Sequence, residues 1–219
     1  MATRPKQSID ERLLAAQVAI DNGLGDAGIA AALGAFGYDQ AKLNAGKTLY
    51  TEAVALVNKQ KAEYGDQFEA SAAVKAAWDK ADAAYSASLK VARVALKDSA
   101  KGQAAMMLSG TRKQSLSGWI EQATAFYSNM LGNADLLAAM AAFGYDQANL
   151  AAEQALAQAV VNANLVQEKE KGEAQDATKL RDAKLDALDT WMSDFKAIAT
   201  VALDEHPQWL EKLGFGAVP

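Results

Sequence analysis

A chain of 219 residues is long enough to bury one sizeable hydrophobic core or two small ones. It contains no cysteine and has a net charge of −5 at neutral pH. The absence of cysteine excludes disulfides, thiolate metal sites and cysteine nucleophiles. The negative net charge disfavours nucleic-acid binding, which requires a concentrated basic surface. Abundant alanine, only three prolines and the lack of alternating β-branched runs predict an all-α fold.

The first predicted helix begins near Ser8, because a serine can cap the free amide groups at a helix N-terminus. It ends at residues 22–25, Asn-Gly-Leu-Gly, where asparagine and glycine let the backbone leave the helix. A short helix is expected over roughly residues 26–36, with Phe36 on its apolar stripe.

The sequence Ala-Phe-Gly-Tyr-Asp-Gln-Ala follows at residues 35–41 and recurs unchanged at 142–148. When the two copies of this string are aligned, residues 8–96 match residues 115–203 without a gap, and about a third of the aligned positions are identical. We interpret the chain as a tandem duplication of one helical repeat. Positions that this alignment pairs are called equivalent positions below.

The repeated string is interpreted as a corner between two helices. Its glycine would end the short helix, its aspartate would cap the next helix, its phenylalanine would fill the core and its tyrosine would pack across the corner. The alternative is one uninterrupted helix that tolerates the glycine at a cost of about 1 kcal/mol. The break is the favoured interpretation.

From Asp39 to about Leu96 apolar residues recur at heptad spacing, which is typical of a coiled coil. The middle of this stretch is polar and contains Gly65, and the second copy has Gly172 at the equivalent position. The glycine could mark the tip of a hairpin of two antiparallel helices, or a single helix of about 58 residues could span roughly 87 Å. Average helix lengths favour the hairpin.

The predicted organisation is a pair of helical repeats, each closed by a short helix. Helical repeat 1 covers residues 8–108, a basic linker covers 109–114 and helical repeat 2 covers 115–215. The two repeats are expected to pack together as one structural unit, an antiparallel, four-helix-like bundle with short capping helices.

The motifs of enzymes and metalloproteins are not found. His206 is the single histidine of the chain, whereas a histidine-based di-iron site needs more than one. A Ser–His–Asp catalytic triad would depend on this one residue, which stands beside a proline outside the long helical segments. Residues 45–48, Ala-Gly-Lys-Thr, end like a phosphate-binding loop, but the glycine that this loop requires would fall at Ala41. We therefore predict no enzymatic activity, no cofactor and no metal ion.

Two groups of residues remain as candidate sites. Tyr38, Asp39, Tyr145 and Asp146 could bind a polar ligand if a pseudo-two-fold axis brought the two corners around one cleft, although packing and capping explain them more simply. The aspartates of the final long helix share a face at positions 182, 186 and 189. This face is interpreted as solvated, with docking to a basic partner as the alternative.

The function predicted from these observations is that of a non-enzymatic, cytoplasmic helical scaffold or protein-interaction module, which binds a protein partner or itself. The alternative is a small-molecule-binding protein with its pocket at the pseudo-two-fold axis between the corners. No stretch approaches the roughly 18 uncharged apolar residues of a membrane span, and nucleic acid is not an expected partner.

Overall fold

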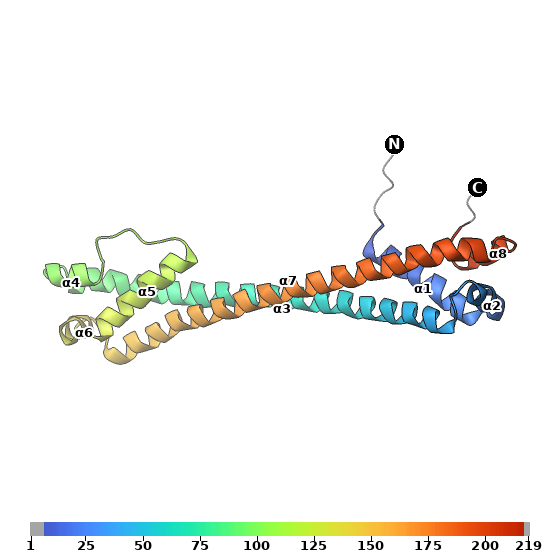
Figure 1. Ribbon diagram of the computed structural model, residues 1–219. Helices are drawn as coiled ribbons and strands as arrows, with labels where there is room; N and C mark the ends of the chain where they lie inside the picture. Colours follow the sequence, from blue (N-terminus) through green and yellow to red (C-terminus); the bar gives the residue numbers. More distant parts are fainter. Residues whose placement is uncertain (1–6, 217–219) are drawn as a thin grey trace, which may run out of the picture. The chain divides into compact units, whose positions relative to one another are not determined.

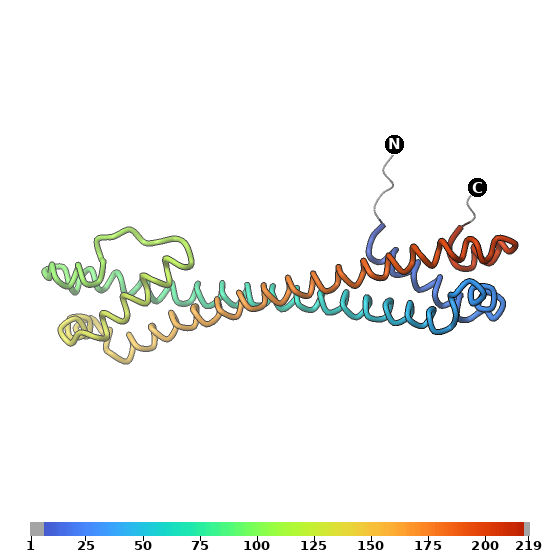
Figure 2. Tube along the Cα trace, in the orientation of Figure 1, coloured from blue at the N-terminus to red at the C-terminus, as the bar shows by residue number. Residues whose placement is uncertain are grey.

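The computed structural model describes residues 7–216, which form α-helices and no strand. This confirms the predicted all-α class. Figures 1 and 2 show the helices coloured along the chain. Their bounds are α1 (Ile9–Gly25), α2 (Ala27–Ala35), α3 (Gln40–Ala95), α4 (Ala100–Ala105), α5 (Leu116–Leu131), α6 (Ala134–Ala141), α7 (Gln147–Ala202) and α8 (Pro207–Lys212).

Tertiary contacts divide the chain into two compact units. Unit 1 contains the described residues up to Tyr64 together with those from Glu173 onward, and unit 2 runs from Gly65 to Gly172. Each unit therefore combines residues of both predicted repeats instead of following the repeat boundaries.

The hairpin expected at the polar middle of each long segment is wrong. α3 continues through Gly65 and α7 continues through Gly172, each as a helix of 56 residues. Neither glycine has a positive φ, so neither makes the turn that a hairpin tip requires. The physical reason is that a glycine costs a helix only about 1 kcal/mol, which the continuous apolar pattern on either side outweighs.

Unit 1 packs α1, α2 and α8 against the first part of α3 and the last part of α7. Within this unit α3 and α7 run antiparallel, because Glu52 pairs with Lys184 whereas the earlier Tyr38 contacts the later Phe195. Ser8 caps α1 in a capping box with Glu11, which confirms the predicted helix start. The core of unit 1 includes Ala16, Ile20, Ile29, Leu33, Leu43, Leu185, Leu188, Phe195 and Leu203.

Unit 2 packs α4, α5 and α6 against the last part of α3 and the first part of α7. Ser115 caps α5 as predicted, since its hydroxyl accepts a hydrogen bond from the amide of Gly118. Aromatic rings contact one another edge to face across the core, with Tyr85 against both Trp119 and Phe126. The buried residues of this core include Tyr85, Leu89, Trp119, Phe126, Tyr127, Met130, Met140 and Leu150.

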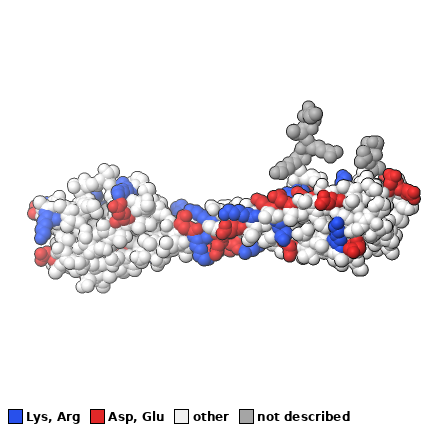
Figure 3. Space-filling model, in the orientation of Figure 1, with Lys and Arg blue, Asp and Glu red and all other residues white. Residues whose placement is uncertain are grey.

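Side chains of both charges alternate along the exposed surface of α3 and α7, as Figure 3 shows. Several pair within one helix, such as Lys171 with Glu168 at 2.7 Å and Lys179 with Asp176 at 3.1 Å. Exposed pairs of this kind contribute little to stability. In the part of the chain that the structure describes, no helix combines the length and the apolar character needed to cross a membrane.

Candidate functional site

The repeated corner of unit 1 ends α2 in a Schellman motif. The amide of Tyr38 donates to the carbonyl of Leu33 at 3.0 Å, and the amide of Gly37 donates to the carbonyl of Gly34 at 3.1 Å. Gly37 has a φ of +83°, a left-handed conformation that favours glycine. The predicted helix break is confirmed.

The corner of unit 2 has the same geometry after α6. The amide of Tyr145 donates to the carbonyl of Met140 at 3.2 Å, and Gly144 donates to Ala141 at 3.0 Å. The φ of Gly144 is again +83°. The glycine and the backbone amide of the tyrosine therefore end the preceding helix in the same way at both corners.

The two aspartates are helix caps, as the simpler interpretation expected. The Oδ1 of Asp39 accepts the amide of Lys42 at 2.9 Å, and the Oδ1 of Asp146 accepts the amide of Asn149 at 2.8 Å. Both carboxylates are exposed.

The two tyrosines pack within their own units. Tyr38 is 2 % exposed, and its ring lies 5.1 Å from that of Phe195 and 5.7 Å from that of Trp191. Burial, with a smaller contribution from Asp194, raises the pKa of Tyr38. Tyr145 is half-buried against the core of unit 2. The ligand-binding hypothesis for the corner residues stays a prediction.

The phenylalanines contradict the expectation that they fill the core. Phe36 is 50 % exposed and Phe143 is 51 % exposed, at the last position before each left-handed glycine. The reason is that the motif places the residue after the glycine, here the tyrosine, against the preceding helical turn, and directs the phenylalanine outward.

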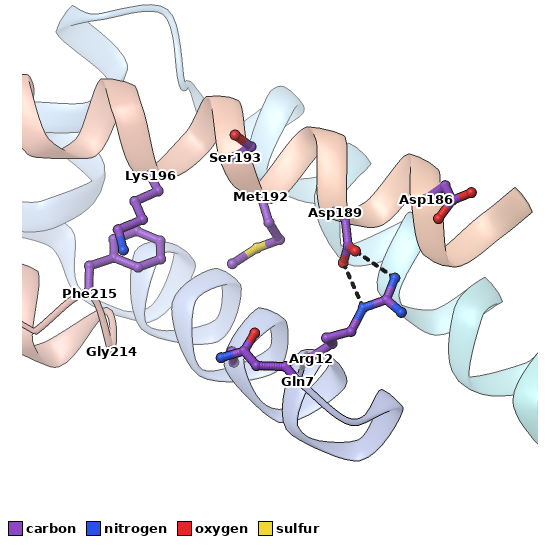
Figure 4. Close-up of a pocket in the computed structure, with 10 residues that line it drawn as sticks. Gln7, Arg12, Asp186, Asp189, Met192, Ser193, Lys196, Gly214 and Phe215 are labelled. Atoms are coloured by element: carbon purple, nitrogen blue, oxygen red, sulfur yellow. Dashed lines mark hydrogen bonds and ion pairs between the residues drawn. The ribbon is translucent and has the colours of Figure 1, made fainter. Parts of the chain in front are cut away.

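A groove of about 470 Å³ lies in unit 1 between the start of α1, the last part of α7 and the segment that follows α8. Figure 4 shows Arg12 extending from α1 to Asp189 on α7, with Lys196 and Phe215 near the other end of the groove. The complete lining is Gln7, Arg12, Ala15, Asp186, Asp189, Met192, Ser193, Lys196, Gly214 and Phe215.

Charged groups of both signs line this groove. The guanidinium of Arg12 binds Asp189 through two hydrogen bonds, Nε to Oδ1 at 3.1 Å and Nη2 to Oδ2 at 2.5 Å. The ammonium of Lys196 lies 5.7 Å from the centroid of the Phe215 ring.

A second groove of about 380 Å³ lies in unit 2. Its lining is Trp78, Asp79, Asp82, Ala83, Arg112, Lys113, Gln114 and Trp119. Positions 79, 82, 114 and 119 of this lining are equivalent to positions 186, 189, 7 and 12 in the groove of unit 1. The two grooves therefore occur at corresponding places of the two predicted repeats.

A polar cluster of unit 2, formed by buried Tyr127 and Ser88 and half-buried Glu153, was not predicted from the sequence. The hydroxyls of Tyr127 and Ser88 both donate to Oε2 of Glu153, the former at 3.0 Å. Burial raises the pKa of Tyr127, and the neighbouring carboxylate of Glu153 raises it further. The positions equivalent to Tyr127, Ser88 and Glu153 hold Ile20, Phe195 and Gly46. The signal in the sequence is that three positions are polar in one repeat and apolar or glycine in the other.

The chemistry available in the grooves is that of ion pairing and hydrogen bonding. His206, the single histidine of the chain, stacks on Trp209 with 4.1 Å between ring centroids and lines neither groove. The carboxylate, hydroxyl and guanidinium groups suit recognition of a polar or charged ligand. Comparison with known proteins returned no match to a family model, a curated protein or a solved structure.

Proposed function

We propose that the protein is a non-enzymatic helical interaction module that presents the same docking corner twice. The observation that carries this proposal is the exposure of Phe36 and Phe143 within an otherwise explained string. Helix termination accounts for the glycine and tyrosine, and capping accounts for the aspartate. An aromatic ring kept at the surface of both corners is typical of an anchor that a partner buries.

The tandem duplication is part of this proposal. It is supported by the repeated string and by the bounds of the long helices. α3 and α7 begin at Gln40 and Gln147 and end at Ala95 and Ala202, which are equivalent positions at both ends. The heptad spacing within α3 supports coiled-coil packing against α7 inside each unit. A duplicated corner would let one chain hold two copies of a partner, or two further copies of itself, with increased avidity.

Photo-cross-linking tests this function. A photoreactive phenylalanine analogue at position 36 or 143 should cross-link to the same protein in extracts of the source cells. Phe68 is the matched control, because it is a 72 % exposed phenylalanine on α3 that belongs to neither corner. The same analogue at position 68 should give no such product.

Substitution provides the quantitative arm of the experiment. Phe36→Ser or Phe143→Ser alone should weaken binding of the cross-linked partner, and the double variant should abolish it, whereas Phe68→Ser should bind normally. Thermal unfolding should stay unchanged because both side chains are half-exposed. Undiminished binding by a folded double variant would contradict the proposal.

A further inference from the structure

One end of the groove in unit 1 presents a cation beside apolar surface. Figure 4 shows Lys196 and Phe215 at this end, with Met192 between them and Arg12. The ammonium of Lys196 lies 5.7 Å from the centroid of the Phe215 ring. Among the described residues it has no carboxylate partner and no hydrogen-bond acceptor. The positive charge at this end of the groove is therefore not balanced by the described part of unit 1.

The other cation of the groove is already paired, because both oxygens of Asp189 bind the guanidinium of Arg12. Met192 and Lys196 lie four residues apart on α7, so their side chains are neighbours on one face of the helix. The groups available to a ligand at this end are thus an ammonium and the apolar surface of a thioether and a ring. They suit a ligand that has a carboxylate close to an apolar group.

The corresponding groove of unit 2 lacks this combination. The position equivalent to Lys196 holds Leu89, which is buried. The position equivalent to Ala15 holds Gln122, whose side chain accepts the amide of Lys113 at 2.8 Å and so holds the linker in place. Unit 2 therefore has an apolar core residue where unit 1 has the unpaired ammonium.

The two repeated corners carry the complementary groups. Phe36 and Phe143 are half-exposed, and an exposed aspartate follows each of them three residues later, Asp39 and Asp146. Each aspartate accepts a backbone amide through Oδ1, and neither carboxylate has a cationic partner in the described part of the chain. An aromatic ring and an unpaired carboxylate therefore occur together at both corners.

We propose that the groove of unit 1 binds the phenylalanine corner of a second copy of the chain. The phenylalanine ring packs against Met192 and Phe215, and the carboxylate of Asp39 or Asp146 pairs with Lys196. The groove has a volume of about 470 Å³, within the range of about 300 to 1,000 Å³ that is typical of ligand pockets, so one aromatic side chain can enter. This inference rests on the proposed docking corners and names their partner.

The contact joins two different surfaces of the chain, and such heterologous contacts let copies join into larger assemblies. Lys42 lies beside the corner of unit 1, where its ammonium is 4.1 Å from the centroid of the tyrosine ring, and it would repel Lys196. The equivalent position at the corner of unit 2 holds Asn149, which has no charge. Phe143→Ser should therefore weaken the assembly more than Phe36→Ser does.

Sedimentation velocity tests the proposal. The chain has a mass of 23.1 kDa, and the unmodified protein should form larger species as its concentration rises. Lys196→Glu replaces attraction to the corner carboxylate by repulsion, so it should raise the dissociation constant at least about tenfold. Ala15→Gln should also weaken the assembly without changing the charge, because it places in the groove the residue that unit 2 has at the equivalent position.

The matched control is Lys179→Glu. Lys179 is also an exposed lysine of α7 but does not line the groove, so this variant changes the net charge equally and leaves the groove intact. It should assemble as the unmodified protein does. Thermal unfolding should be the same for all three variants, because the substituted side chains are exposed.

Mixing two defective variants tests the pairing of corner and groove directly. The double variant Phe36→Ser, Phe143→Ser keeps the groove but loses both corners, whereas Lys196→Glu keeps the corners but loses the groove. Each variant alone should be a monomer at a concentration where the unmodified protein is assembled. The mixture should form complexes of at most one Lys196→Glu copy with two copies of the double variant.

A monomeric unmodified protein, normal assembly of Lys196→Glu, equal weakening by Lys179→Glu, or a mixture that stays monomeric would overturn the proposal. The first two results would leave the docking function intact, because the corners could then bind another protein. Normal assembly of the double phenylalanine variant would instead contradict the docking corners themselves. The two proposals therefore fail separately.

Discussion

At the scale of single residues, the two units fill corresponding core positions in different ways. Unit 2 places Tyr127, Ser88 and Glu153 where unit 1 has an isoleucine, a phenylalanine and a glycine. Glu153 is half-buried, and its hydrogen bonds with the two buried hydroxyls compensate for the hydration that its carboxylate loses. The polar residues of this cluster therefore depend on one another.

Tyr127→Phe tests that dependence. The variant removes a donor to Glu153 without changing the shape of the 1 % exposed ring, so it should lower the free energy of unfolding by about 2 kcal/mol. Urea unfolding followed by circular dichroism measures this loss. Tyr145→Phe is the control, because Tyr145 lies in the same unit and its hydroxyl bonds no described residue; it should change stability by less than about 0.5 kcal/mol. Equal effects of the two substitutions would contradict the role of the cluster.

The same tyrosine predicts how stability responds to alkaline pH. The pKa of Tyr127 is raised in the folded protein, so the folded chain keeps a proton that the unfolded chain loses near pH 10. This contribution is fully present below about pH 10 and is lost as the pH rises toward the folded pKa, at up to about 1.4 kcal/mol per pH unit. Urea midpoints measured on both sides of that pH should fall less steeply in Tyr127→Phe. Parallel curves for the two proteins would refute this assignment.

At the scale of helices, the glycines of α3 have two different roles. Gly46 lies against the ring of Trp191 on α7, and a Cβ built at position 46 would overlap that ring. Gly65 is exposed in the same helix, and a Cβ there would meet nothing within 4 Å. Gly46 is thus needed for the close approach of two helices, whereas Gly65 is not.

Alanine substitution distinguishes these roles. Gly46→Ala should destabilise the protein by about 1 to 3 kcal/mol, because the indole must shift within a packed core. Gly65→Ala should stabilise it by about 0.5 to 1 kcal/mol, since alanine favours a continuous helix. Thermal and urea unfolding measure both. Destabilisation by Gly65→Ala would instead favour the hairpin turn that the structure excludes.

At the scale of the whole molecule, the compact units do not coincide with the predicted repeats. Unit 2 is one continuous stretch of chain, Gly65–Gly172. All residues of its aromatic core lie within this stretch. A single predicted repeat, residues 8–108, contains part of each unit. It lacks the segments of the second repeat that complete the core of either unit. Independent folding is therefore expected of the continuous unit and not of one repeat.

Fragments test this organisation. A fragment of residues 65–172 should unfold cooperatively on heating and give dispersed NMR signals. A fragment of residues 8–108 should lack a cooperative transition as a monomer, because its α1 and α2 miss the partners that α7 supplies in unit 1. Sedimentation analysis identifies the monomer. A folded monomeric 8–108 fragment beside an unfolded 65–172 fragment would contradict the division into units.

The sequence by itself determined the features that depend on neighbouring residues. Helical class, the caps at Ser8 and Asp39, and the break at Gly37 follow from local hydrogen bonds and from the left-handed conformation that glycine permits. These interactions close within a few residues, so the pattern of side chains is sufficient to predict them.

Only the tertiary structure decided which side chains are covered and by what. The local motif directs Phe36 outward, but only the packing of α7 brings Trp191 and Phe195 against Tyr38 and buries it. Whether α3 would break at Gly65 likewise depended on the segments, far away in the sequence, against which its apolar side chains pack. Burial and ion pairing are set by such distant contacts, which a local pattern does not contain.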